Sequence, residues 1–202
     1  MILDDLNAEI PKLLLLDPTV TSVQLAGSRE RGDENALSDW DFVVETDDAG
    51  ALREDISHLV ESLNPLVGQW DRLGPVWCYM LILKGGVKVD IIVAETTQVD
   101  EPPWKVSAEN LPGIDDHFWD WTLWLGSKCL KDDSDMVTRE LTKMFDHLLE
   151  PLGVRQVPES IGEAISAYTA ARDHHTEELG VTIKLNLQSE VIGALRRSGL
   201  DI

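Results

Sequence analysis

The sequence has few cysteines and no long apolar run. Only Cys78 and Cys129 occur in 202 residues, and neither belongs to a Cys-x-x-Cys pair of the kind that binds zinc or carries out redox chemistry. We expect both to be core thiols in a reducing compartment. The leucine run Leu13–Leu16 is far too short to span a bilayer, and Met1–Asp5 lacks the basic segment of a secretory signal peptide. The sequence therefore predicts a cytoplasmic protein that does not act on membranes.

Basic residues are also scarce. The chain has 17 Lys and Arg against 37 Asp and Glu, which gives a formal net charge of -20. The excess is spread along the chain, because residues 1–110 contain 8 basic and 21 acidic residues and the rest contain 9 and 16. No basic arm or stripe is present to neutralise phosphates, so we do not expect long DNA or RNA as a substrate. Such acidity attracts cationic small molecules, but it also serves solubility or adaptation to salt, and both interpretations stay open.

Against this background, the segment Gly27–Gly32 has the residues of a phosphate-binding turn. It follows the strand-like stretch Thr21–Ala26. Glycine permits a sharp turn and a close approach to a ligand, and Ser28 adds a hydroxyl and a backbone N–H suited to a phosphate oxygen. Arg29 and Arg31 offer two guanidinium groups as counter-charges for a triphosphate. The segment therefore predicts a site for a nucleotide.

Acidic residues in two strand-like runs form the second motif. Asp39 and Asp41 are two residues apart, so on an extended segment they lie on the same face. Asp90 is the one acidic residue in the apolar run Val87–Val93. Three converging carboxylates would suit Mg²⁺, which takes oxygen ligands and shares them with substrate phosphates. Asp90 is also the expected general base, which would take the proton of a reacting hydroxyl. Glu95 is the alternative, although the odd spacing, 95 − 90 = 5, places it on the other face of an unbroken strand.

In this order and spacing the two motifs resemble those of the DNA polymerase beta-type nucleotidyltransferase superfamily. The likeness is strongest to its small bacterial branch, which includes the aminoglycoside and lincosamide nucleotidyltransferases. It rests on Gly27-Ser28, Arg31-Gly32 and Ser38-Asp39-x-Asp41, with Gly27 and Asp39 separated by 39 − 27 = 12 positions, and it covers about the first half of the chain. The resemblance implies ATP as co-substrate and a site with two Mg²⁺ ions. The nucleotide-binding residues would be Gly27, Ser28, Arg29, Arg31 and Ser38, and the catalytic, metal-binding residues would be Asp39, Asp41 and Asp90.

The whole pattern predicts an α+β protein with two parts. A nucleotidyltransferase-type mixed β-sheet with packed helices occupies residues 1–110, and an all-α helical bundle on the substrate side occupies residues 111–202. In the first part, apolar spacing predicts helices over Ile2–Leu16, interrupted or restarted at Pro11, and over Ala49–Leu63. The strands expected after them are Leu66–Asp71, Val76–Leu83 and Val87–Val93.

The second part should be helical throughout. Pro102-Pro103 and Leu111-Pro112-Gly113 bracket a predicted linker. Three groups of residues beyond it could have a function, but a structural role is favoured for each. The aromatic residues Phe118, Trp119, Trp121 and Trp124 are interpreted as core residues of a helix. The pair His174-His175 is interpreted as solvent-exposed, and the group of His117, Asp115 and Asp116 as the start of a helix. The expected helices are Asp115–Leu130, Ser134–Leu149, Glu159–Leu179 and Thr182–Arg197.

Together these patterns predict a metal-dependent adenylyltransferase that moves AMP from ATP onto a hydroxyl of a small molecule. A cationic acceptor such as an aminoglycoside would make the activity one of antibiotic resistance. One alternative is a nucleotidyltransferase-like antitoxin that binds a toxin, although such a minimal module would not need the helical second part. Another is nucleotidyl transfer to a protein or a tRNA, of which tRNA is disfavoured by the missing basic surface. Fold class alone does not fix the acceptor, the nucleotide base or the oligomeric state.

Overall fold

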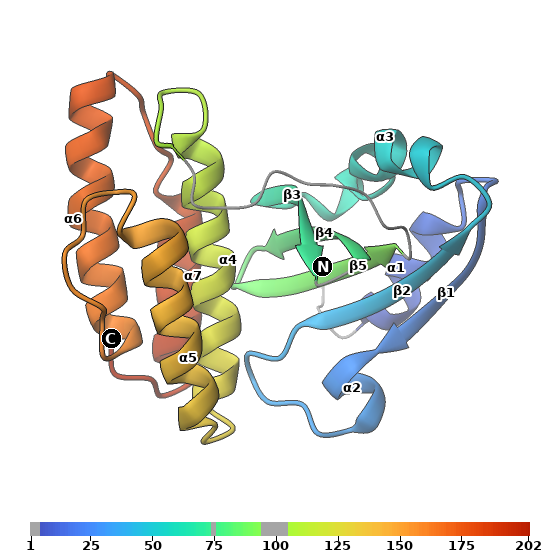
Figure 1. Ribbon diagram of the computed structural model, residues 1–202. Helices are drawn as coiled ribbons and strands as arrows, with labels where there is room; N and C mark the ends of the chain where they lie inside the picture. The colour runs from blue at the N-terminus through green and yellow to red at the C-terminus, as the bar shows by residue number, and fades with distance from the viewer. Residues whose placement is uncertain (1–4, 74–75, 94–104) are drawn as a thin grey trace. The chain divides into compact units, whose positions relative to one another are not determined.

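The computed structural model describes residues 5–73, 76–93 and 105–202, and the chain forms two compact units (Figure 1). The first unit contains Met1–Glu34 and Ser38–Val99, and the second contains Asn35–Leu37 and Asp100–Ile202. The first combines a sheet with helices, which confirms the predicted α+β class, and the second is built of helices. In the described ranges, no helix combines the length and the apolar character that crossing a membrane requires.

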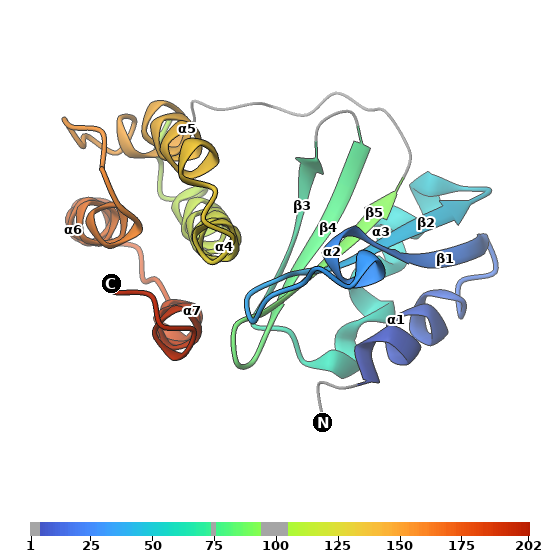
Figure 2. The ribbon, with the colours of Figure 1, turned by 90° about the horizontal axis from the view of Figure 1, so that it is seen from below.

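One five-stranded sheet organises the first unit, with the strand order β1-β2-β5-β4-β3 (Figure 2). β2 and β5 are parallel, whereas the other neighbouring pairs are antiparallel. The predicted mixed orientation is therefore confirmed. Two predicted strands, β4 and β5, have the expected bounds, and β3 begins one residue later than predicted. The strands are β1 (Val20–Ala26), β2 (Trp40–Thr46), β3 (Val67–Leu73), β4 (Val76–Leu83) and β5 (Val87–Val93).

Helices α1 (Leu6–Leu14) and α3 (Ala49–Leu59) contribute to the apolar core on one face of this sheet. Alternate residues of the strands point into that core, for example Phe42 of β2 and Ile91 of β5, which are both fully buried. Each such side chain contributes about 1.5–3 kcal/mol by leaving water. Because side chains alternate along a strand, the residues between the core positions lie on the opposite face. That opposite face carries the acidic residues of β2 and β5.

The predicted interruption of the first helix at Pro11 is wrong. α1 runs through Pro11, and the N–H of Leu15 donates to the Pro11 carbonyl at 3.0 Å. Proline removes one hydrogen bond of the helix, but the buried residues Leu6, Ile10 and Leu14 lie along one face of α1 and hold it on the sheet. The helix predicted over Ala49–Leu63 is nearly as expected, because α3 ends at Leu59 and the 3₁₀ turn Glu61–Leu63 follows it.

The described residues of the second unit form four α-helices and a π-helical segment, Phe145–Leu149, which continues α5. The prediction that Leu111-Pro112-Gly113 ends a linker is wrong, because these residues begin α4. Pro112 lies in the first helical turn, where its missing N–H has no partner within the helix in any case. α7 begins at Asn186 rather than at Thr182. The helices are α4 (Leu111–Cys129), α5 (Ser134–Met144), α6 (Ile161–Leu179) and α7 (Asn186–Arg197).

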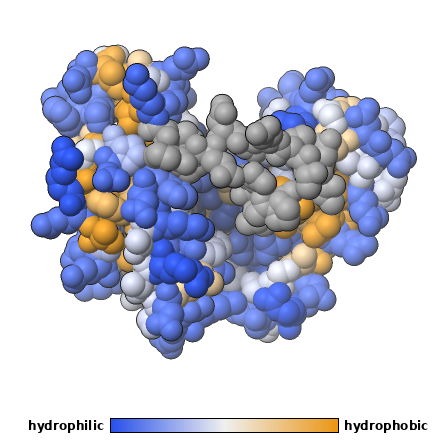
Figure 3. All heavy atoms as spheres, viewed as in Figure 1, coloured by the Kyte–Doolittle hydropathy of each residue, from blue (hydrophilic) through white to orange (hydrophobic). Residues whose placement is uncertain are grey.

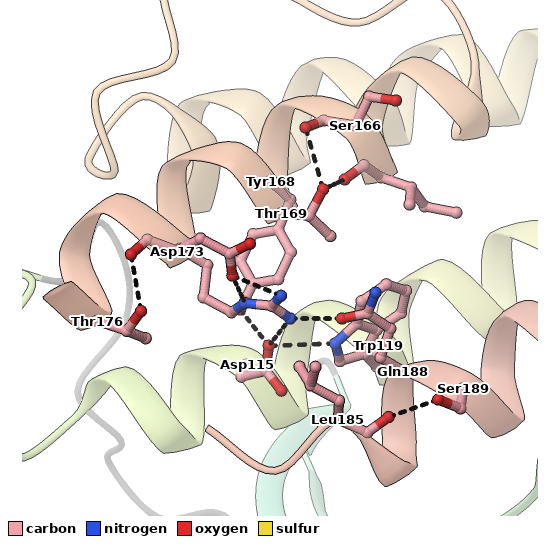
Figure 4. A network of polar contacts seen from close by, with 12 residues as sticks. Asp115, Trp119, Ser166, Tyr168, Thr169, Asp173, Thr176, Leu185, Gln188 and Ser189 are labelled. Carbon is pink, nitrogen blue, oxygen red and sulfur yellow. Dashed lines mark hydrogen bonds and ion pairs between the residues drawn. The ribbon is translucent and has the colours of Figure 1, made fainter. Parts of the chain in front are cut away.

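A buried polar network links α4, α6 and α7 (Figure 4). The Asp115 carboxylate accepts hydrogen bonds from the Tyr168 hydroxyl at 2.8 Å, the Trp119 indole at 3.1 Å and the Arg172 guanidinium at 3.2 Å. Arg172 also donates to Gln188 at 2.7 Å. A buried ion pair is tolerated when such hydrogen bonds satisfy it. Asp115 is thus an interior residue of α4, and its predicted place in a helix-start cluster is wrong because the helix begins four residues earlier.

The predictions for the aromatic residues, the histidine pair and the cysteines are confirmed only in part. Phe118 and Trp119 are fully buried, which confirms the core role predicted for them, and the Phe118 ring stacks on Tyr168 with the ring centroids 3.7 Å apart. Trp121 and Trp124 are only half-buried, so the core prediction is wrong for these two. The solvated histidine pair is correct only for His174, because His175 is half-buried with Nε2 3.1 Å from the Leu152 carbonyl oxygen. Of the two cysteines, Cys78 is buried as expected, but Cys129 at the end of α4 is only half-buried.

The surface agrees with the acidic composition. Hydrophilic residues cover most of the face shown in Figure 3, interrupted by small apolar patches. Exposed large apolar side chains include Leu15, Leu16, Val157 and Leu185.

Candidate active site

Asp39, Asp41 and Asp90 come together on the face of the sheet opposite to α1 and α3. Asp41 and Asp90 are register partners on the parallel strands β2 and β5, and Asp39 lies directly before β2. One carboxylate oxygen from each of the three lies within 4.8 Å of the others. Asp90 is buried, and the other two are half-buried. Three like charges this close repel one another unless a cation compensates them, and oxygen ligands at this spacing suit a hard divalent cation.

The backbone of Gly27 lies against one of these carboxylates. Gly27 follows Ala26, the register partner of Asp41, and it adopts φ +71°. A Cβ atom at this position would overlap Oδ2 of Asp41. Glycine is therefore required both by the left-handed backbone and by the close approach of the carboxylate. The expected open turn is in fact a short helix, α2 (Gly27–Arg31), and the Ser28 side chain is buried at its first turn.

Arg29 connects α2 to the chain that enters β2. Its guanidinium donates to the carbonyl oxygens of Asp39 at 2.9 Å and Ser38 at 2.7 Å, and it lies over the Trp40 ring at 4.2 Å. Burial lowers the pKa of Arg29, while nearby carboxylates, Glu34 first among them, act in the opposite direction. The guanidinium expected to face a triphosphate thus has backbone partners that orient the segment carrying Asp39.

The other predicted nucleotide-binding residues differ in their surroundings. Ser38 is buried and adjoins Asp39, whereas the Arg31 side chain is 57% exposed and pairs with Asp33 at 3.2 Å. The structure therefore places Gly27, Ser28 and Ser38 next to the residues that carry the carboxylates and turns Arg31 toward a neighbouring acid. Glu95, the alternative base, lies outside the described residues.

Sequence reasoning missed Lys88. This lysine lies two residues before Asp90 on β5, and its ammonium donates to Asp90 Oδ1 at 2.5 Å. The side chains of the two residues are only 4% and 6% exposed. The spacing of two was visible in the sequence and places both residues on one face of a strand. A buried cation thus adjoins the acidic cluster.

Gln69 was also missed. The sheet register aligns Asp41 with Asp90, Asp90 with Met80, and Met80 with Gln69, so these four residues form one row across the sheet. The Gln69 Nε2 atom is buried and has no hydrogen-bond partner among the described residues. Burial of an unpaired amide is unfavourable, and such groups call for a reason. No sequence signal identifies Gln69, because its place in the row depends on the register of three strands.

Comparisons with known proteins give distant structural similarities. The chain matches no protein-family model and no curated protein. A cytoplasmic RNA terminal U-transferase is 19% identical over 44% of this chain and 27% of its own, with a TM-score of 0.33. The polymerase core of TRAMP, an RNA surveillance complex, is 15% identical over 56% of this chain and 34% of its own, with a TM-score of 0.37.

A third solved structure is similar along nearly the whole chain. This aminoglycoside 6-adenyltransferase from Bacillus subtilis is 10% identical over 96% of this chain and 98% of its own, with a TM-score of 0.37. The chain spans less than two thirds of the length of the first two structures.

Proposed function

We propose that the protein is a metal-dependent nucleotidyltransferase that moves AMP from ATP onto a hydroxyl of a small, cationic molecule. One observation carries the proposal: oxygens of Asp39, Asp41 and Asp90 lie within 4.8 Å of one another beside the start of α2. The sheet register and the close contact with Gly27 hold two of these acids in place, so their convergence does not depend on flexible side chains alone. An arrangement of this kind suits a site that binds a divalent ion together with a triphosphate.

Each site residue has a role in this proposal. Asp39 and Asp41 would hold Mg²⁺, and Asp90 would hold Mg²⁺ and accept the proton of the acceptor hydroxyl. Gly27 and Ser28 would approach the phosphates, and Ser38 would offer a hydroxyl to them. Arg29, held by the carbonyls of Ser38 and Asp39, and Arg31 would supply positive charge near the phosphates. Bound Mg²⁺, at one or two positions, would supply charge neutralisation of the triphosphate and acidification of the hydroxyl.

The chemical step is an in-line displacement. The acceptor oxygen forms a bond to the α-phosphorus of ATP, and the bond between that phosphorus and the bridging oxygen of pyrophosphate breaks. Pyrophosphate leaves with the electron pair of that bond, and the hydroxyl proton moves to the Asp90 carboxylate. The protein contributes mainly orientation and electrostatic complementarity, which dominate phosphoryl-transfer catalysis.

The acceptor follows from charge. With a net charge of -20, the protein attracts polycations and repels polyanions over distances of about 10 Å at moderate salt. We therefore propose an aminoglycoside-like amino sugar as acceptor, which would give the protein a role in antibiotic resistance. We also propose that residues 111–202 form the substrate-side domain and that the protein is cytoplasmic. A long nucleic acid is disfavoured by the same charge.

A labelling panel tests the proposal. ATP labelled at the α-phosphate is incubated with Mg²⁺ and, in separate reactions, aminoglycosides, neutral polyols, tRNA and proteins. We expect label on an aminoglycoside, no label when a chelator is present, and a KM for the acceptor that rises with ionic strength. Asp41→Asn should abolish transfer, whereas Asp55→Asn, which removes an exposed carboxylate of α3, should not.

The outcomes separate the alternatives. Label on tRNA or protein would move the acceptor to those classes, and label on a neutral polyol alone would remove the charge argument. If neither the wild type nor any variant labels any of the acceptors, the toxin-binding module is favoured instead. Normal turnover by Asp41→Asn would contradict the proposed site.

A further inference from the structure

Lys88 occupies an unusual position for a lysine. On β5, Val89, Ile91 and Val93 pack into the apolar core, so Lys88 and Asp90 share the opposite face. The Lys88 side chain is 4% exposed, and its ammonium donates to Asp90 Oδ1 at 2.5 Å. Lysine is almost never fully buried unless it is paired, because removing an ammonium from water is costly without a compensating charge. Its partner here is a member of the carboxylate cluster.

This position gives Lys88 an electrostatic effect on the whole cluster. The three carboxylates together carry a formal charge of −3, and the Lys88 ammonium in contact with Asp90 reduces the charge of the group to −2. The same ammonium repels any divalent ion that approaches Asp90, because two cations in a poorly solvated site interact strongly. It also fixes the Asp90 side chain by a charge-assisted hydrogen bond. Lys88 therefore both orders the site and weakens its attraction for a metal.

We infer that Lys88 is an internal counter-cation that makes tight metal binding depend on the nucleotide. In the protein without ligands, Lys88 holds Asp90 in the cluster and limits the affinity for a divalent ion. A triphosphate adds negative charge at the site, so the ion binds tightly only together with the nucleotide. Lys88 is thus a positioning residue. The inference rests on the proposed function in one respect, namely that the cluster takes a divalent ion and a nucleoside triphosphate.

Mn²⁺ binding without nucleotide tests this inference directly. The free Mn²⁺ signal in electron paramagnetic resonance gives the dissociation constant for the wild type, Lys88→Met and Lys88→Arg. Lys84→Met serves as the matched control, because Lys84 is exposed in the turn between β4 and β5. We expect Lys88→Met to bind Mn²⁺ about tenfold more tightly than the wild type, since it loses the repelling charge. Lys88→Arg and Lys84→Met should bind within about twofold of the wild type.

Two further measurements separate this role from a purely structural ion pair. Thermal unfolding without metal should show a lower midpoint for Lys88→Met, because Asp90 loses its ion pair with Lys88, and saturating Mn²⁺ should raise that midpoint more than it raises the wild-type midpoint. A non-hydrolysable ATP analogue should strengthen Mn²⁺ binding strongly in the wild type and only weakly in Lys88→Met. A structural ion pair alone would lower the midpoint and leave the Mn²⁺ affinity and this coupling unchanged.

The results also distinguish this inference from the proposed function. A folded Lys88→Met that binds Mn²⁺ no more tightly than the wild type would overturn the inference even if the wild type transfers AMP. If circular dichroism shows that Lys88→Met does not fold, Lys88→Gln provides the same comparison, and it too must bind Mn²⁺ more tightly. If these affinities change as expected but no acceptor is labelled, the transferase proposal fails and the role of Lys88 stands. Absence of Mn²⁺ binding by every variant, with or without the ATP analogue, overturns both.

Discussion

Replacement of Gly27 by alanine would change the candidate site from its backbone side. Gly27 adopts φ +71°, a left-handed conformation that costs about 1–2 kcal/mol for a residue with a Cβ atom. The new Cβ would also overlap Asp41 Oδ2, so the carboxylate or the start of α2 must move. Overpacking of this kind costs about a further 1–3 kcal/mol. Displacement of Asp41 would open the cluster in which the carboxylate oxygens lie within 4.8 Å.

Gly32→Ala provides the matched control. Gly32 has φ +73°, and a Cβ placed there meets no atom within 4 Å. Both variants should therefore lose about 1–2 kcal/mol of unfolding free energy through backbone strain, and Gly27→Ala should lose more. Urea denaturation measures this difference. In a titration with Mn²⁺ and an ATP analogue, Gly27→Ala should bind the metal more than about tenfold more weakly, which corresponds to about 1.4 kcal/mol, and Gly32→Ala should bind it as the wild type does.

The comparison can refute the reasoning in two ways. Equal metal affinities for the two alanine variants would show that the Gly27 backbone does not determine the position of Asp41. Equal unfolding free energies would show that the overlap is relieved without cost, for example by a small rotation of the carboxylate. Loss of metal binding in both variants would instead point to a requirement for the whole of α2.

Three further predictions concern buried polar groups. Burial and the neighbouring Asp115 raise the pKa of Asp116 to about 6, so the folded state loses stability as the pH rises from about 4 to 6. In urea unfolding at pH 7, the free energy of unfolding of Asp116→Asn should therefore be about 1 kcal/mol higher than that of the wild type. Below pH 4 this difference should disappear. Asp115→Asn should cost about 3 kcal/mol, because it removes the buried carboxylate that Arg172 contacts, while Arg172 keeps Asp173 at 2.7 Å. Tyr168→Phe should cost less, about 1–2 kcal/mol, and the reverse order in urea unfolding would contradict the network. Gln69→Leu should leave the unfolding free energy within about 0.5 kcal/mol of the wild type, because the amide nitrogen that it removes is buried without a hydrogen-bond partner among the described residues; a loss of more than about 1 kcal/mol in urea unfolding would contradict this.

Parts of the fold and site follow from local sequence patterns. The bounds of β4 and β5 were predicted because β4 is a continuous apolar run, Gly85 and Gly86 mark the turn after it, and β5 is rich in β-branched residues that alternate with Lys88 and Asp90. The parity of Asp39 and Asp41 predicted that these two acids share a face. Their approach to Asp90 was expected from the oxygen ligands that a divalent cation needs and from the resemblance, not from a local pattern, since the pairing of β2 with β5 joins strands that are distant in sequence.

The missed features depend on contacts that sequence patterns do not specify. Leu111-Pro112-Gly113 has the composition of a loop, yet proline is equally suited to a first helical turn. The network of Asp115 and Arg172 joins residues 57 positions apart, and neither stands in a recognisable motif. Lys88 could have been found, because its spacing from Asp90 places both on one face, but a lysine in a strand is usually interpreted as an exposed residue.

The two faces of the sheet explain why stability and the proposed chemistry can coexist in the same strands. On β5, alternate residues pack against the helices and contribute burial energy, while Lys88 and Asp90 between them carry opposite charges on the other face. The apolar residues fix the register, since a slip by one residue would move charges into the core. That fixed register brings Asp41 beside Asp90 and holds the like charges together. Burial of the apolar residues thus offsets the repulsion between the carboxylates, and the positive charge of Lys88 lessens that repulsion. The cluster of carboxylates can therefore form before any metal binds.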